Sequence, residues 1–208
     1  MTAITERRTV TVPIELRAAD VSASKGNKIT GYAARYYDPA DETTQYELWE
    51  GCYERIMPGA FDSAMSRPDD VRALFNHDAN MILGRSTANT LTLSVDDQGL
   101  KFSVDLPDSP AGQTVAEAIR RGDITGCSFS FDVLKCTWTE DDTNPMQSMA
   151  YRNIEDLRLY DVGPVTFPAY QATEVDMNCV RSSRDEARRS RAVPDAVQMR
   201  RRRLRRST

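Results

Sequence analysis

The sequence predicts a mainly β protein with a few helices, an α+β or β-barrel-like fold. Two observations lead to this prediction. Short runs in which apolar and polar residues alternate recur from residue 9 to residue 165, with turn residues between them. Only a few stretches carry the signals of a helix. The chain has 208 residues, of which 40% are hydrophobic and 28% charged, so it can bury one sizeable core.

The predicted strands are rich in β-branched and aromatic residues. They span residues 9–17, 28–37, 71–77, 81–86, 90–95, 100–106, 124–138, 150–154 and 157–165. Pro13 favours an edge position for the first strand, and Pro164 interrupts the ladder near the end of the last. Residues 96–99, DDQG, have the composition of a hairpin turn, whereas residues 46–57 fit neither a strand nor a helix clearly.

Two stretches within the strand-rich region predict helices. Residues 60–65 suit a short helix after a Pro-Gly pair. Further along, Ser109 is a good N-cap and Pro110 suits the first helical position. This second helix should run to about Arg121, with Gly122 as its stop.

Charge divides the chain into two parts. Residues 181–208 contain eleven Arg against three Asp and Glu, a net charge of +8, whereas residues 1–180 contain 16 Lys and Arg against 28 acidic residues, a net charge of −12. We therefore expect a folded domain at 1–180 and a basic tail at 181–208. The tail should be helical, at 184–192 and 195–205, or else disordered. Its charge suits an anionic partner.

Several classes of protein are not indicated. No apolar run approaches the roughly 20 residues that span a bilayer, and the N-terminus lacks the apolar part of a secretory signal, so no membrane partner is expected. The cysteines form no CxxC pair and have no histidine at ligand spacing; they are Cys52, Cys127, Cys136 and Cys179. We expect reduced thiols in a cytoplasmic setting, no metal site and no cofactor.

Residues 122–131, GDITGCSFSF, contain the most informative serine of the chain. In a strand, Cys127 and Phe129 would share one face, and Ser128 and Ser130 the other. The Ser128 side chain would then point away from the packed face and could contact another group. Most serines in strands are surface or hydrogen-bonded residues, and a serine becomes a useful nucleophile only when a base removes its proton.

Asp161 is the most informative carboxylate. It is predicted to share a strand face with Leu157 and Leu159, and a carboxylate that continues an apolar face must be paired or hydrogen-bonded. An arginine such as Arg152 or Arg158 would give it a purely structural partner. A histidine would give it a catalytic one, because a carboxylate can fix the tautomer of an imidazole.

The chain contains one histidine, His77, at the end of the predicted strand 71–77. A lone histidine is more often a half-buried structural residue, but His77 is the one base that the chain can offer Ser128 as an imidazole. These residues indicate a Ser128–His77–Asp161 triad as a hypothesis. Asp78 and Asp132 are alternative third members that spacing alone does not exclude.

Cys127 is an alternative nucleophile next to Ser128. Neighbouring strand residues face opposite sides, so Cys127 and Ser128 cannot both face His77. The pattern places Cys127 among packed aromatic residues, where it would be an inert small hydrophobe.

Several motifs resemble those of the prohead (capsid maturation) serine proteases of tailed phages, the HK97-like family. They occur in the family's order and are ITGYA (29–33), MPGAF (57–61), NHD (76–78), LGR (83–85), DQGL (97–100), RGDITGCSFSF (121–131) and DVGPVTFPAY (161–170). The resemblance covers about residues 28–175. The family usually has glutamate where this chain has Asp161, and serine where it has Gly163.

The resemblance implies a serine endopeptidase whose nucleophile is Ser128 and whose base is His77, with Asp161 in the acidic role. It implies a fold related to the herpesvirus maturation protease, with 1–180 as the protease domain. Its substrates would be the scaffolding segment of the major capsid protein and the protease itself, inside the prohead in the host cytoplasm, and a homo-oligomer is expected. The resemblance does not cover the basic tail, for which we favour binding to acidic scaffold; contact with DNA, or a solvated cleavable end, is the alternative.

Two other functions fit the same residues. The chain could be a catalytically silent assembly protein that keeps the fold without the chemistry. It could also be a protease with another substrate.

Overall fold

The computed structural model describes residues 6–10, 14–17, 27–67, 70–141, 143, 148–167 and 177–192. Contacts along the chain divide it into two units, Met1–Val175 and Asp176–Thr208. The second unit contains helix α3, Met177–Ala192, which includes the stretch predicted to be helical at 184–192. The second predicted tail helix, 195–205, lies outside the described residues. None of the helices in the described ranges is long and apolar enough to cross a membrane.

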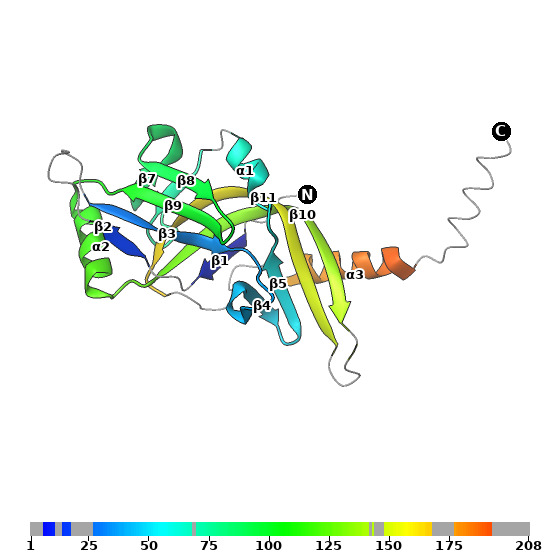
Figure 1. Cartoon of the computed structure of the whole chain (residues 1–208). Helices are drawn as coiled ribbons and strands as arrows, with labels where there is room; N and C mark the ends of the chain where they lie inside the picture. Colours follow the sequence, from blue (N-terminus) through cyan, green and yellow to red (C-terminus); the bar gives the residue numbers. More distant parts are fainter. Residues whose placement is uncertain are drawn as a thin grey trace, which may run out of the picture. The chain divides into compact units, whose positions relative to one another are not determined.

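The first unit is built mainly from strands (Figure 1). They are β1 (Glu6–Val10), β2 (Glu15–Arg17), β3 (Lys28–Arg35), β4 (Gln45–Trp49), β5 (Cys52–Ile56), β6 (Arg72–Leu74), β7 (Ile82–Arg85), β8 (Leu91–Val95), β9 (Gly99–Asp105), β10 (Gly126–Asp141) and β11 (Met149–Val165). Its helices are α1 (Asp62–Ser66), α2 (Pro110–Arg121) and the 3-10 turns η1 (Glu42–Thr44) and η2 (Ser86–Ala88). The prediction of a mainly β fold with a few helices is confirmed.

The strands form two open sheets, so the prediction of a barrel was wrong. One sheet has the order β1-β10-β11-β5-β4, with β6 and β7 continuing from β11, and the other has the order β2-β3-β9-β8. A closed barrel needs every strand to be hydrogen-bonded on both edges, and no ladder among the described residues joins the two sheets. The predicted strand 9–17 would have linked them, but it is divided into β1 and β2, which belong to different sheets. Pro13 lies outside the described residues.

Both sheets and α2 contribute to one apolar core. Phe129 and Phe131 of β10 are fully buried, and their rings stack with centroids 4.9 Å apart. Phe102 of β9 and Val115 and Ile119 of α2 belong to the same buried cluster. This core fixes the inner face of β10 and leaves its other face for polar groups.

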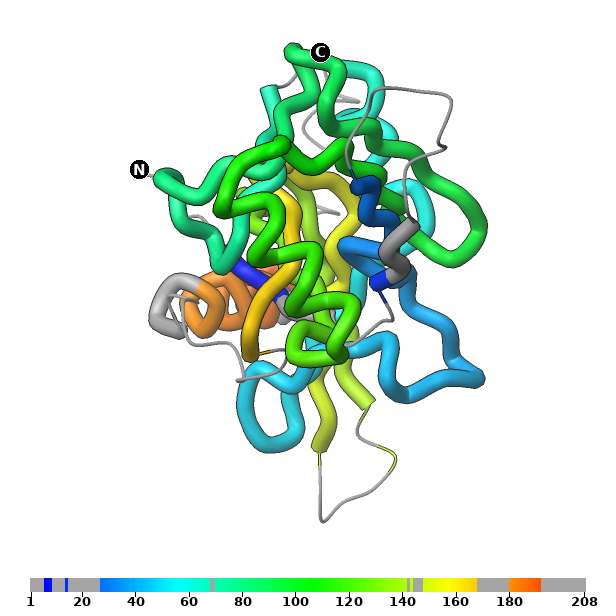
Figure 2. The backbone as a smooth tube through the Cα atoms, turned by 90° about the vertical axis from the view of Figure 1, so that its left-hand side faces the viewer, coloured from blue at the N-terminus to red at the C-terminus, as the bar shows by residue number. Residues whose placement is uncertain are grey.

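Helix α2 has the bounds that the sequence predicts. The Ser109 hydroxyl accepts a hydrogen bond from the Gly112 N–H, and Gly122 ends the helix with φ of 81°. Figure 2 shows this helix, in green, on the side that faces the viewer.

Strands β10 and β11 form the long antiparallel pair that carries the candidate site, and Figure 1 shows that both are curved. Their register sets Ser130 opposite Asp161 but Phe131 opposite Leu159. Tyr160 is therefore an extra residue in β11, a β-bulge. The predicted strands 150–154 and 157–165 are one continuous strand.

Candidate active site

Ser128 lies on β10 with the orientation that the alternation predicts. Cys127 and Phe129 are buried in the core, while the Ser128 side chain points from the opposite face. Its Oγ lies 2.7 Å from Nε2 of His77 and donates a hydrogen bond of 2.8 Å to the carbonyl oxygen of Arg8. Ser128 is only 1% exposed, so it is in a desolvated position.

His77 is held by a turn and not by the strand predicted at 71–77. Strand β6 ends at Leu74, and Asn76 and His77 adopt left-handed backbone conformations with φ of 54° and 57°. The Asn76 N–H donates to the Pro164 carbonyl, and its side chain exchanges two hydrogen bonds with Thr166. Asparagine tolerates this conformation better than most residues, so Asn76 anchors the turn that presents His77.

Asp161 reaches His77 because of the bulge at Tyr160. The prediction that Asp161 shares a face with Leu157 and Leu159 was wrong: both leucines are buried on the core face, whereas the extra residue turns Asp161 to the face of Ser130. Asp161 Oδ1 lies 2.5 Å from His77 Nδ1. Bulges often redirect a side chain beside an active site.

The alternative carboxylates have other partners. Asp132 accepts a hydrogen bond of 2.6 Å from the hydroxyl of Tyr160, and this bond raises the pKa of Tyr160. Asp78 accepts from the backbone and side-chain N–H groups of Asn80 at 2.8 and 2.9 Å. Within the described residues, the side-chain hydrogen bonds of His77 are those to Asp161 and Ser128.

Ser130 also belongs to this constellation, although the sequence analysis assigned it no role. Its hydroxyl donates to Oδ2 of Asp161 and leaves Oδ1 for His77. Ser130 shares the face of Ser128 by the period of two, so the signal was present in the sequence. Cys127 remains outside the site, because burial raises the pKa of its thiol and its side chain packs in the core.

Gly163 lies opposite Ser128 in the β10–β11 ladder. A Cβ at this position would stand 2.9 Å from the carbonyl carbon of Leu74 and 3.1 Å from its nitrogen, and closer still to its oxygen. The absence of a side chain therefore lets β6, and the His77 turn that follows it, lie close to β11.

Among the described residues, no group of three His, Cys, Asp or Glu side chains could hold a metal ion.

Comparisons with known proteins bear on the fold and the family of the chain. No functionally curated protein matches the chain. The capsid assembly protease of bacteriophage T4, gp21, has a similar structure, with a TM-score of 0.52 and 12% identity over 81% of this chain and 100% of that one. The family model described as caudovirus prohead serine protease matches residues 13–188. The chain belongs to the family of caudovirus prohead serine proteases.

Proposed function

We propose that this chain is a serine endopeptidase of capsid maturation in which Ser128 is the nucleophile, His77 the general base and Asp161 the carboxylate that orients the base. The chain of contacts from Asp161 through His77 to Ser128, at 2.5 and 2.7 Å, carries this proposal. Three side chains from distant parts of the sequence meet in the order that acyl transfer requires.

The mechanism follows from these contacts. Ser128 Oγ attacks the carbonyl carbon of the scissile peptide bond, and its proton passes to Nε2 of His77. The imidazolium then gives this proton to the amine that leaves as the C–N bond breaks, and water hydrolyses the remaining ester by the same route. Asp161 holds the proton of His77 on Nδ1, so that Nε2 is free to act as base. The hydrogen bond from Ser130 fixes the orientation of the carboxylate.

Family membership suggests the substrates. We infer that the chain cleaves the scaffolding segment of the major capsid protein, and itself, inside the prohead in the host cytoplasm, as a homo-oligomer of the 1–180 protease domain. The capsid-assembly role in the name of the T4 protein is consistent with this inference.

The direct test is co-expression with the cognate major capsid protein, read by intact mass. The wild type should yield capsid protein without its scaffolding segment, and Ser128→Ala should yield the uncleaved precursor. Ser94→Ala is a matched control, because Ser94 is an exposed serine on β8 of the other sheet. Cleavage that persists in Ser128→Ala would refute the assignment.

A catalytically silent assembly protein is the main alternative. A serine-directed phosphonate separates the two functions, since it labels only an activated serine. Labelling of the wild type at Ser128, and no labelling of His77→Ala, is expected for the protease. Mass spectrometry of the cleavage products would identify a protease with another substrate.

We further propose that the basic tail, residues 181–208, directs the protein to an anionic surface of the scaffold. Arg189 and Arg191 lie in the last turn of α3, where cations are favoured. A form without the tail should co-sediment poorly with assembling shells. If the form without the tail is incorporated as well as the full chain, a targeting role is excluded. The tail would then either bind nucleic acid or be a solvated end.

We also expect the fold to be related to that of a second group of viral proteases. The resemblance to the family implies a relation to the herpesvirus maturation protease, and the two sheets described above are the part to compare. A superposition that matches the order of β10, β11 and β6 would support the relation. A different strand order around the nucleophile would exclude it.

A further inference from the structure

Strand β1 occupies the edge of β10 beside the nucleophile. It pairs antiparallel with β10, with Arg8 opposite Phe129 and Thr9 opposite Ser128. The other edge of β10 is taken by β11. An extended peptide can bind an exposed sheet edge through backbone hydrogen bonds. The edge that β1 covers is therefore the place where a substrate strand could lie against Ser128.

A backbone carbonyl of β1 contacts the nucleophile. Ser128 Oγ lies 2.8 Å from the carbonyl oxygen of Arg8 and 2.7 Å from Nε2 of His77. A serine hydroxyl carries one proton, so it can donate to the Arg8 carbonyl or to His77, but not to both at once. The Arg8 carbonyl therefore lies beside the nucleophile, with its oxygen toward Oγ, and it competes with the base for the proton.

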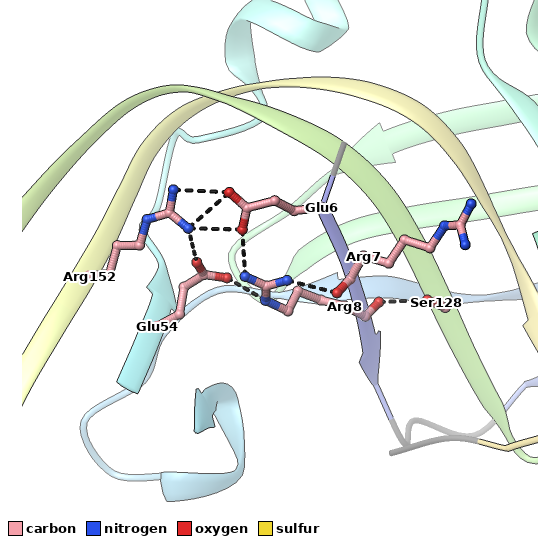
Figure 3. A network of polar contacts seen from close by, with 6 residues as sticks. All are labelled: Glu6, Arg7, Arg8, Glu54, Ser128 and Arg152. Carbon is pink, nitrogen blue, oxygen red and sulfur yellow. Dashed lines mark hydrogen bonds and ion pairs between the residues drawn. The ribbon is translucent and has the colours of Figure 1, made fainter. Parts of the chain in front are cut away.

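The side chains of β1 enter a buried charge cluster (Figure 3). Arg152 bonds both carboxylate oxygens of Glu6 at 2.8 and 3.0 Å and one oxygen of Glu54 at 2.9 Å. Arg8 contacts Glu54 at 2.6 Å and Glu6 at 2.7 Å. All four residues are buried. Burial opposes the ionisation of Glu6, but Arg152 and Arg8 hold the pKa of its carboxyl below the usual range.

Two of the four residues of this charge cluster belong to β1, and two belong to the strands around it. Glu6 and Arg8 come from β1, whereas Glu54 comes from β5 and Arg152 from the facing position of β11. Without β1, Glu54 and Arg152 would still neutralise each other across 2.9 Å. The strands around β1 therefore present the Glu54 carboxylate and the Arg152 guanidinium to alternate residues of whichever strand pairs with β10 at this edge.

We propose that β1 takes the place of a substrate strand, and that Glu54 and Arg152 form the subsite that selects a basic residue immediately before the cleaved bond and an acidic residue two positions earlier. Arg8 and Glu6 have these positions in β1. This inference rests on the proposed function, because it assumes that Ser128 attacks the carbonyl that lies beside it. A strand with the two charges exchanged would bring like charges together in a buried site.

Peptides test the subsite without altering the protein. The full-length enzyme is given peptides with the sequence around β1, in three forms: Glu-Arg-Arg as in residues 6–8, Arg-Arg-Glu with the outer charges exchanged, and Gln-Arg-Met without them. The first should be cleaved after its third residue, and the exchange should lower kcat/KM by about 100-fold. Equal rates for the three peptides, or a preference for the neutral one, would overturn the inference.

A charge-balanced variant tests the occupancy of the edge by β1. The double substitution Glu6→Gln with Arg8→Met removes one charge of each sign and leaves Glu54 paired with Arg152. Since β1 is then held less tightly, a serine-directed phosphonate should label Ser128 about tenfold faster than in the wild type. Lys28→Met with Asp105→Asn is the matched control, because it removes an ion pair of 3.1 Å from the other sheet; its labelling rate should equal that of the wild type.

The outcomes separate the two proposals. Equal labelling of the charge-balanced variant and the wild type means that β1 does not cover the substrate edge, and it overturns the inference alone. If no protein is labelled and no peptide or capsid precursor is cleaved, the proposed function fails, and the inference fails with it.

Discussion

Substitution of Gly163 by alanine should reduce activity more than stability. The new Cβ would lie 2.9 Å from the carbonyl carbon of Leu74, whereas ordinary contacts begin near 3.4 Å. The backbone of β6 would have to move away from β11 by about 1 Å, which typically costs about 1–3 kcal/mol in a packed interior. His77 follows Leu74 by three residues, so the same shift would displace its ring from Asp161. A displacement of about 1 Å in a catalytic group costs roughly 100-fold in rate.

The assay compares capsid processing, read by intact mass over time, with urea unfolding of the same protein. Gly163→Ser, which introduces the residue that the family usually has here, should behave no better than alanine. Gly122→Ala is the matched control: at φ of 81° it should cost about 1–2 kcal/mol of strain, but its Cβ meets nothing within 4 Å. Its processing rate should stay near that of the wild type. If Gly163→Ala processes capsid protein normally, the close approach of β6 to β11 does not position His77.

Four further outcomes follow from the contacts described above. Asp161→Asn should lower kcat by about 10⁴, because the amide favours the wrong tautomer of the imidazole; near-normal turnover in the capsid assay would remove Asp161 from the mechanism. Ser130→Ala should lower kcat by about tenfold, the usual worth of one hydrogen bond to a charged group, and an unchanged rate would show that the carboxylate needs no such support. Cys127 should resist iodoacetamide in the folded protein at pH 8, since burial raises the pKa of its thiol; peptide mapping that finds rapid alkylation would contradict the packing of β10. Arg152→Met should cost about 3–5 kcal/mol in urea unfolding, because it leaves the two buried carboxylates of Glu6 and Glu54 with one guanidinium, that of Arg8, and a loss below about 1 kcal/mol would mean that the cluster is well solvated.

Local periodicity predicted the orientation of Ser128, because the alternation along β10 is unbroken at that point. It did not predict the conformation of His77, since the left-handed turn at Asn76 depends on hydrogen bonds to residues about 90 positions away. It gave the wrong face for Asp161, because a bulge such as that at Tyr160 changes the period without an obvious local signal. The assignment of His77 and Asp161 to the candidate site came from residue type and motif order.

The arrangement of the sheets was harder to predict for a similar reason. Residues 46–57 were ambiguous, and they form parts of β4 and β5, which are joined by a turn with Gly51 at φ of 73°. Residues 9–17 alternate as one strand should, but β1 and β2 pair with different sheets. Strand pairing is decided by contacts between residues far apart in the sequence, and local patterns of residues do not specify those contacts.

The bulge at Tyr160 also means that the face on which Asp161 lies depends on how the residues before it in β11 are paired. If Tyr160 took the place opposite Ser130 in a regular ladder, the carboxylate that follows it would turn inward among the leucines and leave the imidazole without its anion. Removing the tyrosine would instead place Asp161 directly after Leu159, still opposite Ser130, because Tyr160 has no partner in β10. The carboxylate therefore reaches the imidazole only while the two residues that separate it from the buried leucine include one that is unpaired.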